Sequence, residues 1–196
     1  MRLLIATRNR HKLDEIRAIL KLPGLELAGA DEVPGLPEVE EDAATFEGNA
    51  LKKARELGCA SGMWTLADDS GLEVAALGGA PGVYSARYAG AAADYPANNA
   101  KLLAALAGVA DRRAQFRCVL ALYAPDGRTW TVEGICRGRI GHLPGGTNGF
   151  GYDPLFLPEG YDRTFAELPA EEKNRISHRA RALAAATREW RALLSV

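Results

Sequence analysis

The first twenty residues read as a short apolar strand, a polar turn and an amphipathic helix. Residues 2–6, RLLIA, form an apolar run with the length of a buried strand. Residues 10–20 then place Leu13, Ile16 and Leu20 at the spacing of one helix face. A strand that leads through a turn into a helix is typical of α/β proteins, so this feature predicts that fold class.

Strands and helices continue to alternate along the chain. A helix is expected after Thr45, which is a good N-cap, and strands are expected at 64–68 and 72–77, joined across Asp-Ser-Gly. The Asp-Gly of PDGR (125–128) is a strong hairpin signal between two long strands. The other expected elements are a strand at 25–30, an acidic loop at 31–44, a helix at 94–109 capped near Asp94, strands at 114–124 and 129–141, and a final helix from about Pro169.

No linker, repeat or low-complexity tract divides the 196 residues, and a chain of this length buries a core without disulfides or metals. We expect a single domain over residues 1–196. The order of the elements predicts an α/β fold with a mixed, strongly twisted central sheet flanked by helices, split into two lobes around a cleft.

Composition and charge exclude several classes of function. The formal net charge is -1, so no global field favours nucleic acid or an anionic membrane, and an anion site must be a local cluster. Cys59, Cys118 and Cys136 are far apart in the sequence, which argues against a disulfide framework and a zinc site and fits a reducing cytoplasm. No apolar run has the length of a signal-peptide core or a membrane span.

The turn TRNRHK, between the first strand and the first helix, is where α/β proteins bind phosphate groups. Free N–H groups and the positive end of the helix dipole converge there. Thr7 and Asn9 add short polar groups, and Lys12 adds a positive charge one turn into the helix. The same residues also fit an ordinary helix cap followed by a solvated basic turn. The Walker A pattern is absent from the chain.

Asp68, Asp69 and Ser70 lie at the end of an apolar run. Side chains of adjacent strand residues point to opposite faces, but a turn would bring both carboxylates to one edge. Carboxylates suit Mg²⁺, and the acidic run EVEED (38–42) offers a third one. A hairpin in which Asp and Ser bond to their own backbone explains the pair as well.

Two further stretches carry candidate functional groups. In GTNGFGYDP (146–154), glycines allow close approach of a ligand, Phe150 offers a ring for stacking on a base, and Asp153 offers an acceptor. A turn with a core aromatic is the alternative. EEKNRISHRAR (171–181) concentrates positive charge on the final helix, where a solvated face is the alternative. Together with the first turn and the paired carboxylates, these stretches suggest a nucleotide with metal-bound phosphates.

Five stretches, spread in order over nearly the whole chain, resemble the inosine/xanthosine triphosphate pyrophosphatase family. They are LLIATRNRHKLDEI, TFEGNALKKA, LADDSGLEVAALGGAPGVYSARYAG, GTNGFGYDPLF and EEKNRISHRARAL. The resemblance implies an elongated two-lobed α/β fold with a central substrate cleft, and a homodimer. It also implies a Mg²⁺-dependent hydrolase that converts the non-standard purine nucleotides ITP, dITP and XTP to the monophosphate and pyrophosphate, and so removes them from the nucleotide pool.

The resemblance also assigns roles to individual residues. Asp69 would be the general base that activates water, and Glu41 and Asp69 would bind Mg²⁺. The residues that would bind substrate are Thr7, Asn9, Lys12 and Lys53 at the phosphates, Ser70, the nucleoside pocket of Phe150, Gly151, Tyr152 and Asp153, and Lys173, His178 and Arg179 near the base.

Discrimination between ITP and ATP rests on one substituent, because a 6-oxo group accepts a hydrogen bond and a 6-amino group donates one. A pocket lined with donors such as Arg179 would favour the oxo group. Two residues depart from the family's pattern. Arg8 stands where glycine is common in the first turn, and Gly48 stands where Glu often precedes Asn, with Glu47 as the candidate substitute.

Other functions remain open beside this one. The same fold acting on other modified nucleotides, such as pyrimidine triphosphates, is the nearest alternative. A non-catalytic nucleotide-binding module is a second, and turnover with Mg²⁺ distinguishes it from an enzyme. Nucleic-acid binding is a third, and the net charge argues against it.

Overall fold

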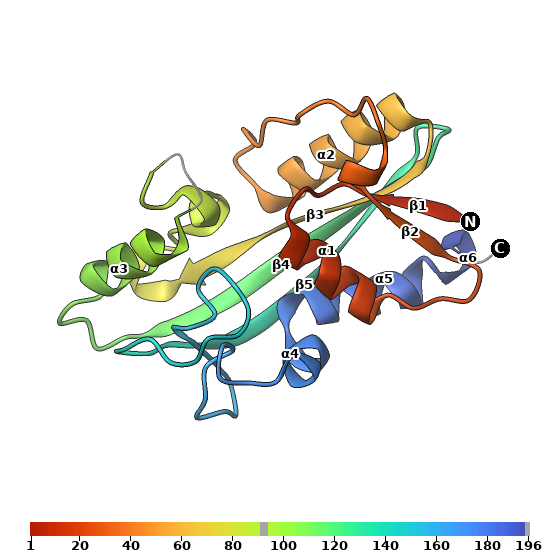
Figure 1. Cartoon of the computed structure of the whole chain (residues 1–196). Coiled ribbons are helices and arrows are strands. Elements are labelled where there is room, and N and C mark those ends of the chain that lie inside the picture. The colour runs from red at the N-terminus through yellow and green to blue at the C-terminus, as the bar shows by residue number, and fades with distance from the viewer. Residues whose placement is uncertain (91–93, 195–196) are drawn as a thin grey trace. The chain divides into compact units, whose positions relative to one another are not determined.

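In the computed structural model, which describes residues 1–90 and 94–194, the chain forms an α/β fold (Figure 1). The strands are β1 (Arg2–Ile5), β2 (Glu26–Gly29), β3 (Trp64–Val74), β4 (Arg113–Tyr123), β5 (Thr129–Ile140) and β6 (Phe156–Pro158). The helices are α1 (Arg10–Ile19), α2 (Phe46–Ser61), α3 (Tyr95–Ala105), α4 (Ala170–Ile176), α5 (His178–Glu189) and α6 (Arg191–Leu194). Short 3₁₀ turns cover Ala30–Glu32, Ala75–Leu77 and Gly82–Arg87. Among the described residues, no helix is both long and apolar enough to cross a membrane.

The six strands form one mixed sheet in the order β2-β1-β3-β4-β5-β6. β1 pairs in parallel with β2 and β3, in a register that places Leu4 opposite Ala28 and Thr65. β5 and β6 pair antiparallel, with Arg139 opposite Leu157. The predicted α/β class with a mixed sheet and flanking helices is confirmed, whereas the elongated shape and the central cleft stay predictions.

The chain folds into two compact units. Unit 1 comprises Met1–Asp69, Cys118–Gly134 and Arg179–Val196, and unit 2 comprises Ser70–Arg117 and Ile135–His178. β3, β4 and β5 each contribute residues to both units. Neither unit is therefore one continuous segment of the sequence.

The core of unit 1 joins β1 to the helices α1 and α5. Leu3 and Ile5 of β1 pack in one buried cluster with Ile16 of α1 and Leu183 of α5. Leu3 and Ile5 are alternate residues, so they share one face of the strand. The apolar strand face and the apolar helix faces that the sequence indicates thus pack together in the same core.

α2 begins directly after the N-cap residue that the sequence predicts. Thr45 Oγ1 accepts the N–H of Gly48 at 3.0 Å, and Gly62 follows the helix with a φ of 68°, which favours glycine. Figure 1 shows α2 on the side of the unit 1 strands opposite to α1 and α5. Helices therefore cover both faces of these strands.

The core of unit 2 is rich in aromatic rings. The ring centroids of Phe116 in β4 and Phe156 in β6 are 4.7 Å apart, and Phe165 stacks at 6.0 Å from Phe116. Leu102 of α3 belongs to the same buried cluster. This core supports the loop after β5, which carries the predicted nucleoside-binding residues.

Three elements differ from the expectation. β3 is continuous from Trp64 to Val74, so the two strands expected on either side of Asp-Ser-Gly are one strand, and that prediction is wrong. β6 is not apparent in the sequence, because three residues are too few to show a period. The final helix is divided at Ser177, which has an extended ψ of 161°, and again at Trp190.

Candidate active site

The first turn and α1 form a capped helix start. Asn9 Oδ1 accepts the N–H of Lys12 at 3.2 Å, and Thr7 Oγ1 accepts the N–H of Asn9 at 3.2 Å. Both oxygens therefore serve the turn itself, as a helix cap requires. The ammonium of Lys12 reaches β3, where Nζ lies 3.3 Å from Asp68 Oδ1.

The side chains of Arg8 and Glu47 have partners other than the carboxylates of β3. Arg8 Nη2 donates to Leu36 O at 3.0 Å, so this side chain leaves the first turn. Glu47 Oε1 accepts from Thr131 Oγ1 at 2.8 Å, so Glu47 does not replace a carboxylate beside the predicted metal ligands. A Cβ at Gly48 would approach the acidic loop too closely, at 2.8 Å from its nearest atom.

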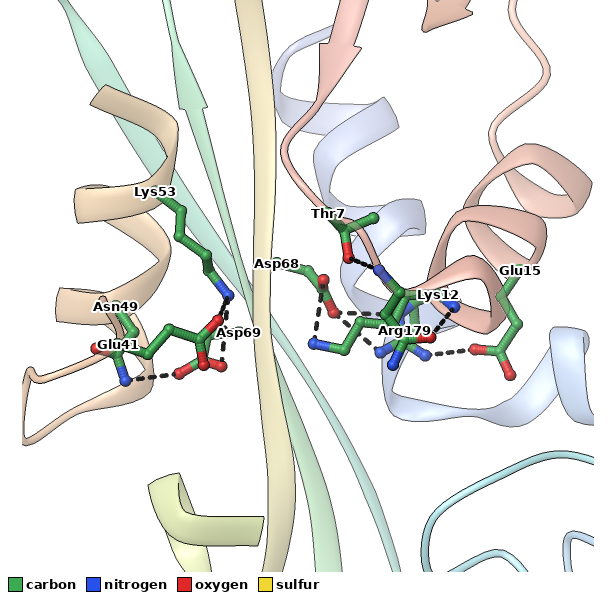
Figure 2. A network of polar contacts seen from close by, with 10 residues as sticks. Thr7, Lys12, Glu15, Glu41, Asn49, Lys53, Asp68, Asp69 and Arg179 are labelled. Carbon is green, nitrogen blue, oxygen red and sulfur yellow. Dashed lines mark hydrogen bonds and ion pairs between the residues drawn. The ribbon is translucent and has the colours of Figure 1, made fainter. Parts of the chain in front are cut away.

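Asp68 and Asp69 point to opposite faces of β3 (Figure 2). Both belong to the continuous strand, where successive side chains alternate. Asp68 faces the side of α1 and α5, and Asp69 faces α2. The expected turn that would bring both carboxylates to one edge is therefore wrong, and so is the hairpin alternative.

Asp68 is the centre of a buried chain of alternating charges. Arg179 donates from Nη2 and Nε to Asp68 Oδ2, at 2.9 and 3.3 Å, and from Nη1 to Glu15. Burial alone raises the pKa of Asp68, but the charges of Lys12, Arg179 and Lys53 outweigh it and hold the pKa well below its ordinary value. Arg179 is only 1% exposed and its guanidinium is used within unit 1, so its expected contact with a base stays a prediction.

Asp69 belongs to a second cluster, built by α2 and the acidic loop. Asn49 Nδ2 donates to Asp69 Oδ2 at 3.0 Å, and Lys53 Nζ lies 3.7 Å from Asp69 Oδ1. The same ammonium donates to Glu41 Oε1 at 2.6 Å. Burial raises the pKa of Asp69 above its ordinary value, against the lowering effect of Lys53. A carboxylate with a raised pKa takes up a proton more readily, which suits a general base.

Glu41 and Asp69, the predicted metal ligands, converge on one ammonium. Within residues 1–90 and 94–194, no group of three or more His, Cys, Asp and Glu side chains is arranged to hold a metal ion. The two carboxylates nevertheless provide the oxygen donors that Mg²⁺ prefers, and they approach Lys53 from a loop and from a strand. This donor set fits a Mg²⁺ ion held by one or two protein carboxylates together with phosphates.

Asp153 organises the predicted nucleoside-binding loop of unit 2. Its Oδ2 accepts hydrogen bonds from the N–H of Phe150, at 2.9 Å, and from Lys173 Nζ. The Lys173 ammonium also lies 4.9 Å from the centroid of the Phe150 ring. Gly149 has a φ of 72°, and a Cβ there would lie 2.0 Å from Asp153 Oδ2. The half-buried Phe150 ring is therefore held by a buried ion pair and a tight turn.

Two predicted substrate contacts are buried in the core of unit 2. Tyr152 donates from its hydroxyl to Ser85 O at 2.9 Å, and burial raises its pKa. The ring of His178 stacks on Phe116 with centroids 4.7 Å apart. Both side chains thus have packing roles that explain their presence without a ligand.

The predicted site residues form two groups, each within one unit. Unit 1 holds Thr7, Asn9, Lys12, Glu41, Lys53, Asp69 and Arg179, and unit 2 holds Ser70, Phe150, Gly151, Tyr152, Asp153, Lys173 and His178. Sequence reasoning missed Glu15 and Asn49. Each lies one helical turn from a predicted lysine, Lys12 or Lys53, so the sequence indicates that it shares a helix face with that lysine but not which residue it binds across the fold.

A cavity of about 880 Å³ in unit 2 is separate from these residues. Its lining includes Arg113, Arg117, Arg137 and Arg139, and none of the predicted site residues. Arg113 pairs with Asp111 at 2.7 Å, and Arg117 lies 4.0 Å from Glu73. Neighbouring carboxylates therefore compensate part of the positive charge that lines the cavity.

Fold and side chains together define an α/β protein with a mixed sheet and two buried carboxylate–cation clusters on opposite faces of one strand. The chain belongs to the Ham1 family, whose model matches residues 3–189.

Relatives and solved structures agree with this assignment. A dITP/XTP pyrophosphatase of Syntrophobacter fumaroxidans is 54% identical over 188 residues, which cover 96% of this chain and 81% of the relative. One of Streptomyces coelicolor is 52% identical over 98% of both chains. The solved structure of the Staphylococcus aureus Ham1 protein has a TM-score of 0.89 at 40% identity, and the match covers 98% of this chain and 100% of that one. The family predicted from the sequence is confirmed.

Proposed function

We propose that the chain hydrolyses dITP, XTP and ITP to the monophosphate and pyrophosphate, and so removes non-standard purine nucleotides from the nucleotide pool. Its relatives carry the name dITP/XTP pyrophosphatase and align with nearly the whole chain. The observation that carries the proposal is the Asp69 cluster, in which a lysine and a second carboxylate face a buried carboxylate whose pKa is raised. Such a set suits activation of water beside a polyanion.

In this proposal, cationic and polar groups of unit 1 bind the phosphates. They are Thr7, Asn9, Lys12 and Lys53. Asp69 accepts a proton of a water molecule as the water oxygen forms its bond to the α-phosphorus. The bond that breaks lies between the α and β phosphates, so pyrophosphate leaves. The lysines counter the negative charge that would otherwise repel the nucleophile.

Glu41 and Asp69 would hold the Mg²⁺ ion. When bound, Mg²⁺ supplies positive charge that neutralises phosphate oxygens. Lys53 supports this assignment, because contact with one ammonium directs both carboxylates to a common point.

A separate set of residues is assigned to the nucleoside. Phe150, Gly151, Tyr152 and Asp153 would form the pocket, together with Ser70, Lys173 and His178. The ordered Phe150 ring supports this role, since a fixed aromatic face is suited to stacking on a base. Arg179 would donate to the 6-oxo group, and we expect Arg179→Lys to lower the ratio of kcat/KM for ITP over ATP. An unchanged ratio would remove Arg179 from base recognition.

We further propose a cytoplasmic homodimer. Cys59, Cys118 and Cys136 form no disulfide, which fits a reducing compartment. Light scattering after size exclusion should give twice the chain mass of 21.0 kDa. A mass of 21.0 kDa at micromolar concentration would contradict the dimer, and fractionation of cells tests the location.

The experiment that tests the function is release of pyrophosphate from dITP, XTP and ATP, with and without Mg²⁺. We expect Mg²⁺-dependent release from dITP and XTP, little from ATP, and loss of at least two orders of magnitude in Asp69→Asn. Turnover of modified pyrimidine triphosphates instead would favour the nearest alternative. Binding of dITP without any turnover would favour a nucleotide-binding module.

A further inference from the structure

Asn49 joins three segments of unit 1 through one amide. Its Oδ1 accepts the N–H of Ala43 in the acidic loop at 2.9 Å, and its Nδ2 donates to Asp69 Oδ2 of β3 at 3.0 Å. The side chain lies on α2 and is 1% exposed. Both ends of the amide are therefore used, and each partner belongs to a segment other than α2.

The acidic loop depends on such side-chain contacts for its position. Residues 36–43 form no helix or strand, so no ladder of backbone hydrogen bonds holds them. Glu41 is tied to α2 through Lys53, which lies one helical turn from Asn49 on the same helix. Asn49 holds the loop two residues further along, at its backbone.

Gly48 lets the loop approach α2 at this point. A Cβ there would lie 2.8 Å from Ala43 Cβ and 3.1 Å from Thr45 Oγ1. Gly48 is not among the glycines with positive φ, so the close approach of the loop, rather than backbone strain, explains why a side chain is absent. Gly48 and Asn49 together form the loop anchor.

From this geometry we infer that Asn49 is a positioning residue, which holds the acidic loop against β3 so that Glu41 and Asp69 face one point. The inference rests on the proposed function, in which that point receives Mg²⁺. Because Asn49 donates to Oδ2 of Asp69, the other oxygen faces Lys53, whose ammonium also donates to Glu41. Removal of the amide releases the loop backbone and one oxygen of Asp69 at the same time.

Asn98 provides a matched control for Asn49. It is 2% exposed, its Oδ1 accepts the N–H of Ala89 at 2.6 Å, and its Nδ2 donates to Ala86 O at 3.1 Å. Its partners belong to unit 2 and include none of the proposed catalytic or metal-binding residues. Asn98 Nδ2 also donates to Ser85 O, at 3.5 Å. Asn49→Ala and Asn98→Ala therefore each remove one buried amide whose oxygen and nitrogen are both hydrogen-bonded, and both should lower Tm.

The experiment measures steady-state kinetics with dITP at several Mg²⁺ concentrations, and binding of Mn²⁺ by electron paramagnetic resonance without substrate. For Asn49→Ala we expect kcat to fall about 10- to 100-fold and Mn²⁺ affinity to fall about tenfold, since loss of such outer contacts has effects of this size. KM for dITP should change less than about threefold, and raised Mg²⁺ should restore part of kcat. Asn98→Ala should keep kcat and Mn²⁺ affinity within about twofold.

Gly48→Ala is the second variant, because it displaces the loop while every polar group remains. We expect it to weaken Mn²⁺ binding in the same direction, whether or not Asn49→Ala folds. The inference is overturned if wild type hydrolyses dITP and binds Mn²⁺ while both anchor variants match Asn98→Ala. A wild-type protein that neither hydrolyses dITP nor binds Mn²⁺ contradicts the proposed function itself, which is a separate result.

Discussion

At the scale of single residues, two adjacent aspartates have different environments. Asp68 is paired with a guanidinium and an ammonium, which keep its pKa low. Asp69 is buried beside one lysine and a second carboxylate, and its pKa is raised. Environments that separate the pKa values of two carboxylates are typical of sites with divided roles. Asp68 therefore organises cations, whereas Asp69 is suited to accept a proton.

Replacement of Arg179 tests the buried charge chain. Arg179→Met leaves Asp68 without its guanidinium in a site that is 2% exposed. We expect a loss of about 3–5 kcal/mol in the free energy of unfolding, because removal of one partner leaves a buried charge uncompensated. Urea unfolding measures this loss. The exposed Arg181 of the same helix is the control, and an equal loss in Arg181→Met would contradict the argument.

The low pKa of Asp68 predicts how stability depends on pH. A carboxylate whose pKa is lower in the folded state stabilises the fold above its unfolded pKa of about 3.9, and this contribution is lost as pH falls below that value. Wild type should therefore lose up to about 1.4 kcal/mol per pH unit more than Asp68→Asn below pH 4. Unfolding free energies measured from pH 6 to pH 2 give the two slopes, and parallel slopes would exclude the low pKa.

At the scale of elements, α2 both carries residues of the candidate site and packs closely against the sheet. One side of the helix carries Asn49 and Lys53 toward Asp69, while Gly58 meets β4. A Cβ at Gly58 would lie 2.2 Å from the ring of Tyr123. The glycine therefore sets how closely the helix approaches the sheet.

This contact predicts an unusual sign for a glycine substitution. Gly→Ala inside a helix normally stabilises by roughly 1 kcal/mol. Gly58→Ala should instead destabilise by about 1–3 kcal/mol, because the tyrosine ring must move. Thermal or urea unfolding measures the change. In a Tyr123→Ala background the same substitution should become neutral or stabilising, and destabilisation in both backgrounds would point to another cause.

At the scale of the whole molecule, two cores share three strands. The strands β3, β4 and β5 supply residues to both units. If one unit unfolds, each of these strands loses its regular structure up to the residues that belong to the other unit. All three tryptophans, Trp64, Trp130 and Trp190, belong to unit 1. Their fluorescence therefore reports on unit 1 alone.

We expect both units to unfold in one transition. Tryptophan fluorescence follows unit 1, and hydrogen exchange at the amides of Leu155 and Phe165 follows unit 2. The two probes should give the same free energy of unfolding in urea, since a two-state transition makes all probes coincide. Amides of unit 2 that exchange at clearly lower urea than the fluorescence midpoint would show separate unfolding of the two units.

The sequence by itself determined the α/β class, most strands and helices, the family and the chemical types of the candidate site. Periodicity and caps act between residues that are close in the chain, so Thr45 and the helix spacing of α1 could be identified without coordinates. Only the tertiary structure decided how Asp68 and Asp69 are used. A continuous strand and an Asp-Ser-Gly turn have nearly the same local signals, and sheet pairing selected the strand. That choice placed the two carboxylates on opposite faces, where Arg179, 111 residues away, and Asn49, 20 residues away, became their partners. Contacts over such separations depend on packing, and no local pattern in the chain encodes them.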